Sequence, residues 1–544
     1  MSSSSRADSV VLREGQLSEP EESKARSSDS ERRRRSRGRR NRTGRASLGR
    51  SAATQAGGAQ RPPNPPKIVE SSIDRAENCR FGISTLVGAE RIELSTTCSQ
   101  SRYATAALRP DDRGLSHSER NVSFLRGKDP LSDRARFRRD MAIVVVTGLL
   151  VRAVVLRALP AEVMSIDLRA WETIAGFLAS GQNPYNAAPH WLRWPPSWMQ
   201  VIFGLDHLAR AIGVPLTTVI RLFLILVDAL GVLLAGRLIR RLAPVSVLGP
   251  LLVGWSLNPI AILLVCQHGN FDGLVAVCVL LTLLALVDFL EDADPVSWLR
   301  ACGWLGIGVL VKTIPITLAP LLATGSRLSR RTHALGGALV VGPALYGVSV
   351  VFVLGPWWVR SRVLGYQGMP GWFGITGLLE LAGRADWIPA YRIVFTLAFL
   401  AGMAWLASRA SRGLTPRACV FAAATTLTVI PGLGPGYGAQ YLAWSLFLLL
   451  ALWVIGDRRT RAVLLFFGTV ALVTDLADYG LMASHGAFLL HAGSNASVAH
   501  LSAMLATMKW ATLERLPLFG AYLVLIGQLM RATAGELSLS TSPR

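Results

Sequence analysis

The sequence predicts an all-α polytopic membrane protein: a bundle of about ten transmembrane helices plus a broken helical hairpin, with interfacial helices in the first outer loop. Two observations predict this class. The chain of 544 residues is 51% hydrophobic and only 17% charged. From Met141 onward, apolar runs of about 17–25 residues recur, and each is long enough to cross a bilayer core of ~30 Å.

The first 140 residues have a different composition. They hold 29 Lys or Arg and 18 Asp or Glu, too polar a mixture to bury a core. We therefore expect a disordered basic tail over residues 1–140, a transmembrane domain over 141–531 and a short cytoplasmic tail over 532–544. The run "ERRRRSRGRR" could bind RNA or anionic lipid, but a solvated charge run is the preferred interpretation, so no nucleic-acid partner is expected.

The stretch "GAERIELSTTCSQSRYATAALRPD" in the tail resembles the peptide obtained when a transfer-RNA gene is translated antisense. One hypothesis is therefore that translation starts downstream, at Met141. The alternative is a genuine disordered cytoplasmic extension.

The first span is predicted at 142–159, with the basic stretch "RARFRRD" before it on the cytoplasmic side. Arg152 and Arg157 near its outer end are expected to snorkel to the headgroups. The next stretch, "PPSWMQVIFGLDHLARAIGV", carries an apolar stripe from Trp198 to Ile212, with Asp206 and Arg210 on the other side. This pattern favours a helix that lies in the interface.

Residues 301–325 are predicted to form a helical hairpin that enters from the cytoplasm, because Lys312 and Pro315 divide the run into two halves that are each too short to span. Basic clusters then alternate correctly, both termini lie inside, and the polar loops collect outside. The remaining spans are predicted near 216–242, 247–266, 271–290, 334–355, 391–408, 417–433, 441–456, 461–483 and 513–531.

The first outer loop begins with "SIDLRAWETIAGFLASGQNPY", residues 165–185. Its apolar residues from Leu168 to Leu178 share one face of a short helix that stops at Gly181, and Asp167 lies at its start. An Asp there is commonly a helix cap. The polar and aromatic residues in the same loop favour a functional role instead; they include Glu172, Tyr185, His190, Arg193 and Trp191.

Five stretches together resemble the GT-C class of integral-membrane glycosyltransferases, over about residues 142–456. They are Asp167 followed by "W…G.NPY" and "PP", then "LNPIAILLVCQHGNFDGL", "VLVKTIPITLAPLL", "GYQGMPGWFGI" and "YGAQYLAW". The nearest relatives resembled are the bacterial mannosyltransferases of glycosyltransferase family 87. No single motif is specific; their order and spacing carry the resemblance.

The resemblance implies a GT-C-like bundle that moves a hexose, mannose by expectation, from a polyprenyl-phosphate donor to a lipid-linked or envelope glycan acceptor. It implies a multi-pass protein of the bacterial plasma membrane with an outward-facing active site and Asp167 as catalytic base. A carboxylate in that role must be ionised to take the proton of the incoming hydroxyl.

The donor phosphate needs positive charge near it. The candidates are Lys312, Arg360, Arg362 and Arg193, with plain interfacial anchoring as the alternative for Arg360 and Arg362. The sugar or acceptor candidates are Glu172, Tyr185, His268, Asp272, Tyr366, Gln440 and Tyr441. For His268 and Asp272 the alternative is turn chemistry, and for the aromatic residues it is an interfacial belt.

No metal or other cofactor is expected, because "SIDLR" supplies no second adjacent carboxylate. A disulfide framework is not expected either, because no outer loop holds a pair of the six cysteines. Asp475 and Asp478 are expected to face the bundle, without an assigned role. Two rival functions remain open: a transporter or lipid flippase, for which no internal repeat is visible, and a non-catalytic membrane subunit.

Overall fold

The structure is a computed structural model. The residues that it describes all belong to one unit, Leu108–Arg544, and every regular element among them is helical. The all-α prediction is therefore confirmed for the part of the chain described. The described ranges are 130–159, 165–187, 194–243, 246–354, 373–436, 438–491, 512–513 and 515–540.

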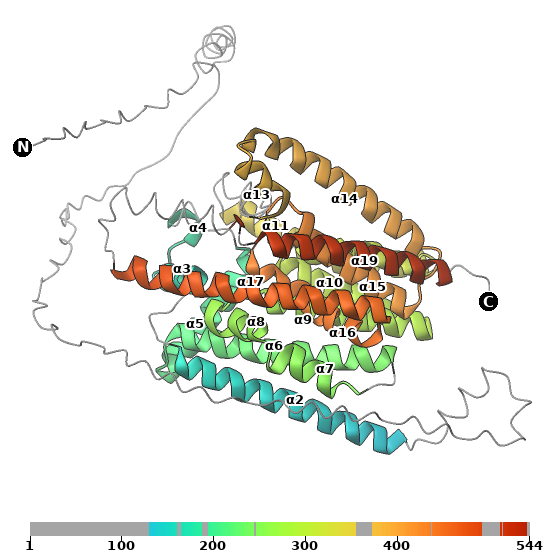
Figure 1. The fold of residues 1–544 in the computed structure, drawn as a ribbon, viewed down its shortest axis with the longest axis horizontal. Helices are drawn as coiled ribbons and strands as arrows, with labels where there is room; N and C mark the ends of the chain where they lie inside the picture. The colour runs from blue at the N-terminus through green and yellow to red at the C-terminus, as the bar shows by residue number, and fades with distance from the viewer. Residues whose placement is uncertain are drawn as a thin grey trace, which may run out of the picture. The chain divides into compact units, whose positions relative to one another are not determined.

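Eight helices in these ranges contain segments long and apolar enough to cross a membrane. Figure 1 shows the long helices running roughly side by side, with three short helices gathered at one end: α3 (Ile166–Ala179), α4 (Pro184–Ala187) and α5 (Pro196–Ile212). Ten crossings were predicted, and the difference lies in two segments described below. The eight helices are α2 (Pro130–Ala158), α6 (Leu216–Leu242), α9 (Asp272–Asp292), α11 (Arg330–Leu354), α14 (Ile388–Ala410), α15 (Pro416–Leu433), α17 (Arg458–His491) and α19 (Leu516–Ser540).

The predicted span at 247–266 is a bent one. It consists of α7 (Leu248–Leu251), η2 (Leu252–Ser256), α8 (Pro259–Leu263) and η3 (Leu264–His268), with a bend of 50° at the break. Asn258 caps α8 through its side chain, which accepts a hydrogen bond from Ile260 N at 3.0 Å. Pro259 cannot donate a backbone hydrogen bond, so the chain turns there. With this pair counted once, the described residues hold nine candidate spans.

The predicted span at 441–456 is the other difference. Its helix, α16 (Leu442–Ile455), has only 14 residues, about 21 Å at 1.5 Å per residue. It is nevertheless the most enclosed helix of the bundle, since most of its side chains are buried against α6, α9, α15 and α17.

The hairpin prediction is confirmed in shape. α10 (Pro295–Val311) ends at Lys312, and η4 (Ile314–Gly325), a 3-10 helix, follows at once. Trp298 at the start of α10 donates its indole N–H to the carbonyl of Leu322 near the end of η4, at 3.0 Å. The two limbs therefore run antiparallel, with Lys312 at the tip.

Two short helices follow α2 at the end of the bundle where Ala158 lies: α3 (Ile166–Ala179) and α5 (Pro196–Ile212). The stripe predicted for α5 is partly wrong. Asp206 lies on the buried face beside Trp198 and Ile202, whereas Leu208 and Ile212 are exposed. Arg210 pairs with Asp206 at 2.8 Å, and this pair allows the carboxylate to be buried.

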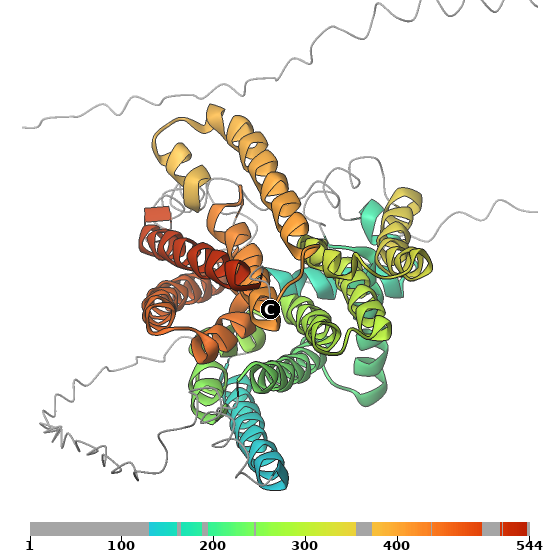
Figure 2. The same cartoon turned by 90° about the vertical axis from the view of Figure 1, so that its right-hand side faces the viewer.

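Figure 2 views the bundle along its length and shows α14 standing away from the other long helices. Its exposed side chains are mostly apolar, among them Ile393, Leu397 and Trp405, as suits a surface in contact with lipid.

At the other end of the sequence, α19 continues to Ser540, past the boundary at 531 predicted for the transmembrane domain. Four cysteines, Cys266, Cys278, Cys302 and Cys419, are free and buried.

Candidate functional site

Asp167 lies in the first turn of α3 but does not cap the helix. Ser165 is the N-cap: its hydroxyl oxygen accepts a hydrogen bond from Leu168 N at 3.1 Å. The face predicted for α3 is confirmed, since Leu168, Trp171 and Ile174 are fully buried. Because Ser165 satisfies the free backbone donor, the Asp167 carboxylate is available for another role.

The Asp167 carboxylate points to the turn between η3 and α9. Asn270 Nδ2 donates to Asp167 Oδ2 at 2.9 Å, and His268 Nε2 lies 3.1 Å from the same oxygen. Oδ1 has no partner in the described part of the chain, and the side chain is 15% exposed. One carboxylate oxygen is thus fixed and the other is left for a ligand.

The surroundings favour the ionised form of this acid. Burial alone would raise the pKa of Asp167, but His268, Asn270 and Lys312 outweigh it through hydrogen bonds and positive charge, and the pKa lies below its usual value. Asp167 is therefore a carboxylate at neutral pH, as a general base must be.

The turn that supplies His268 and Asn270 depends on Gly269, which adopts φ +65°. A side chain is strained in this left-handed region, and a Cβ at this position would also meet the side chain of Leu168 on α3. Asn270 Oδ1 accepts from Asp272 N at 2.8 Å. Ser165 adds a second link, because its hydroxyl donates to the carbonyl of His268 at 2.6 Å.

Lys312 connects the hairpin tip to the same turn. Its ammonium lies 2.6 Å from Asp272 Oδ1 and near the rings of Phe271, Tyr441 and Trp444, at 5.5, 5.3 and 5.0 Å from their centroids. Such aromatic faces attract a cation. The Lys312 side chain is 18% exposed, so it is not completely enclosed by this box.

A small cavity lies behind the turn. Its volume of about 20 Å³ is enough for a bound water. Asp272 Oδ2, which is buried, has no hydrogen-bond partner in the described residues. The polar lining is Asp228, Asn270, Asp272 and Gln440; the predicted candidates Asp272 and Gln440 thus line one space.

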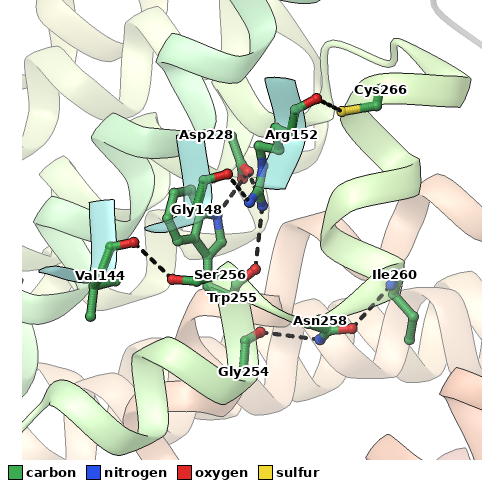
Figure 3. A network of polar contacts seen from close by, with 10 residues as sticks. All are labelled: Val144, Gly148, Arg152, Asp228, Gly254, Trp255, Ser256, Asn258, Ile260 and Cys266. Carbon is green, nitrogen blue, oxygen red and sulfur yellow. Dashed lines mark hydrogen bonds and ion pairs between the residues drawn. The ribbon is translucent and has the colours of Figure 1, made fainter. Parts of the chain in front are cut away.

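A buried ion pair packs against the bent span at Trp255 (Figure 3). Arg152 of α2 and Asp228 of α6 are 2.8 Å apart, and the Trp255 indole N–H also donates to Asp228 Oδ2 at 2.8 Å. Arg152 Cζ lies 4.1 Å from the Trp255 ring centroid. The prediction that Arg152 snorkels is therefore wrong: its side chain is 0% exposed because Asp228 neutralises it inside the bundle. Arg157 is exposed.

The same network reaches the candidate site. Ser256 donates to the carbonyl of Val144 at 2.8 Å, and the Cys266 thiol lies 3.7 Å from the carbonyl of Arg152. α2 therefore contacts the bent span on both sides of its break. Gly148 makes the approach possible, because a Cβ there would occupy the position of the Trp255 ring.

The remaining predicted site residues are buried, exposed or outside the described part of the chain. Tyr185 is buried, and its hydroxyl donates to the carbonyl of Trp194 at 2.9 Å, which gives it a structural contact. Glu172 is exposed, and its charge acts on Arg221 of α6. Tyr441 is buried and stacks on Trp444 at 4.2 Å. Arg193, Arg360, Arg362, Tyr366 and His190 lie outside the described residues.

Sequence reasoning missed Ser165, Asn270 and the Arg152–Asp228 pair. Only Asn270 had a visible signal, since it stands between His268 and Asp272 in "QHGNFDG". In the described part of the chain, no group of three or more His, Cys, Asp or Glu side chains could hold a metal ion. No known family model matches this chain, and no curated protein matches it either.

Proposed function

We propose that the protein is an inverting glycosyltransferase that moves a hexose from a polyprenyl-phosphate donor to a hydroxyl group of a lipid-linked or envelope glycan acceptor. The observation that carries this proposal is the state of Asp167: ionised, freed from capping, fixed through Oδ2 by His268 and Asn270, and open at Oδ1. The resemblance to the GT-C class supports the same assignment.

In the proposed reaction, Asp167 Oδ1 takes the proton of the acceptor hydroxyl as its oxygen attacks the anomeric carbon. The bond from that carbon to the lipid phosphate breaks on the opposite face, so the anomeric centre is inverted. The transition state has oxocarbenium character. The leaving lipid phosphate takes the bonding electrons and needs a cation beside it.

Lys312 is our candidate for that cation. Asp272 binds one of its three N–H donors, and the side chain is partly exposed. The box of Phe271, Tyr441 and Trp444 limits its movement, so that a phosphate would meet a charge held in place. We also propose that the end of the bundle with α3 and α5 faces the outside of a bacterial plasma membrane.

The direct test uses membranes that contain the full-length protein and labelled polyprenyl-phosphate mannose, glucose or arabinose. We expect one donor to be consumed with inversion, and Asp167→Asn to reduce the rate by about 10²–10⁴-fold, the usual contribution of a general base. Asp294→Asn is the matched control: Asp294 is the half-buried N-cap of α10, and Asn caps equally well.

The proposal fails if Asp167→Asn transfers sugar at the wild-type rate, or if none of the donors is consumed while a lipid or solute crosses the bilayer.

A further inference from the structure

A second group of charged residues lies between α17 and α19 and shares no residue with the candidate site. Asp475 and Asp478 are one helical turn apart on α17, within the candidate span Arg458–Asp478. Their exposed fractions are 1% and 2%, so the prediction that they face the bundle is confirmed.

Arg515, the residue before α19, neutralises Asp478. Its Nε donates to Oδ1 at 3.0 Å and to Oδ2 at 2.9 Å, and its Nη2 donates to Oδ1 at 2.8 Å. This forked geometry pairs the charge of the guanidinium with the charge of the Asp478 carboxylate. The pair therefore leaves no charge over for a second acid.

Asp475 has no such partner. Both of its carboxylate oxygens are buried without a hydrogen bond, and so is the hydroxyl of Tyr522 on α19. The titratable groups that act on Asp475 are Asp478 and Arg515, and Asp475 acts in turn on Tyr522. α16 and α8, which also pack against α17, contain no titratable side chain.

The packing around this group is tight and apolar. Tyr522 is fully buried; the ring of Phe467 lies edge-on to it with centroids 4.8 Å apart, and Phe373 approaches at 5.9 Å. An isolated carboxylate in such surroundings is very costly, and such a group normally becomes neutral. Among the residues that the structure describes, the two acids and one arginine carry a net charge of −1, so this group lacks one positive charge.

We propose that Asp475 is a proton-binding site within the membrane domain. Its carboxylate takes one proton from water at neutral pH, forms a neutral carboxylic acid and holds the proton between α17 and α19. The Asp478–Arg515 pair stays ionised beside it. A multidentate metal ion does not fit as the ligand among the described residues, because these place only Asp475 and Asp478 there and Arg515 occupies the second.

The test is infrared spectroscopy of the full-length protein in lipid nanodiscs at pH 7, with aspartate isotopically labelled at its carboxyl carbon. A protonated aspartic acid gives a carbonyl band that shifts on labelling and in heavy water. We expect this band in the wild type and its loss in Asp475→Asn. In Asp478→Asn, one acid and one arginine remain, so we expect Asp475 to ionise beside Arg515 and the band to be lost there too. In the control variant Asp294→Asn, at the N-cap of α10, we expect the band to persist.

Thermal unfolding of the same samples gives an independent readout. Asp475→Asn replaces a neutral acid by a neutral amide, so the Tm should stay at or above that of the wild type. Asp478→Asn removes the carboxylate that accepts three hydrogen bonds from Arg515 and should lower the Tm. A wild type without a label-sensitive carbonyl band at pH 7 overturns the proposal even if a variant does not fold. A band that survives in Asp475→Asn overturns it too.

Discussion

At the residue scale, Asp167 illustrates how a common structural role is separated from a chemical one. An acid at a helix start is ordinarily a cap, yet Ser165 occupies that position and binds Leu168 N as well as the carbonyl of His268. The carboxylate is then held by two side chains that lie about 100 residues later in the chain. Its function therefore depends on contacts that no local pattern specifies.

The pH dependence of sugar transfer tests this arrangement. In the proposed reaction Asp167 acts when ionised; burial raises the pKa of Asp167, and His268 lowers it. Removal of His268 leaves burial less opposed, so more Asp167 is protonated at mildly acidic pH. We therefore expect the acidic limb of the rate profile to move to higher pH in His268→Ala.

The variant His268→Gln should move the limb less, because an amide keeps a hydrogen-bond donor but no charge. Transfer rates measured from about pH 4, near the usual pKa of Asp, to pH 8 check both variants. An acidic limb at the same pH in His268→Ala and the wild type would contradict this account of Asp167.

At the scale of elements, three helical segments meet at the Arg152–Asp228–Trp255 network: α2, α6 and the bent span. The ion pair is almost completely buried. Each charge would be costly to bury alone, and the pair stabilises the bundle because each charge neutralises the other. Because the same bent span ends in His268, the network also sets the position from which the turn reaches Asp167.

Asp228→Asn should therefore destabilise the protein strongly, by about 3–5 kcal/mol, because it leaves the Arg152 charge buried and unpaired. The matched variant is Asp288→Asn, which breaks the pair with Arg241, where both side chains are at least one-third exposed. Its cost should be about 0–1 kcal/mol. Denaturant unfolding in mild detergent measures the free energy of unfolding of both variants. Equal losses of this free energy in the two variants would contradict the prediction.

Some of these structural features could be predicted from the sequence and others could not. The buried face of α3 and the hairpin with Lys312 at its tip follow from local periodicity and from Pro315, and both are present. The pairing of Arg152 with Asp228 could not be read, because residues 76 positions apart share no local signal. Asp206 was placed on the wrong face of α5 because its partner Arg210 lets a charged side chain be buried.

At the scale of the whole molecule, the site residues of the described chain collect near one end of the bundle, where α3 lies (Figure 1). The alternation of basic clusters predicts that this end lies outside, and a sidedness measurement can test that prediction. The four described cysteines are buried, which limits background labelling once Cys79 and Cys98 are replaced by Ser.

In that background, Ser180→Cys at the end of α3 and Ser326→Cys after η4 place single exposed thiols. We expect a membrane-impermeant maleimide to label only Ser180→Cys in intact cells and both variants after the cells are opened. Labelling of Ser326→Cys alone in intact cells would show that the protein has the opposite orientation in the membrane. It would remove the basis for an outward-facing site.

The π-helical turns of the bent span have one further consequence. In η2 the hydrogen bond from Leu257 N to Leu252 O joins residues five apart, one more than in an α-helix. Such a wide turn stores a spare residue. Deletion of one residue between Leu252 and Ser256 is therefore expected to convert this turn into ordinary α-helix and to leave the turn at Gly269 and Asn270 in place.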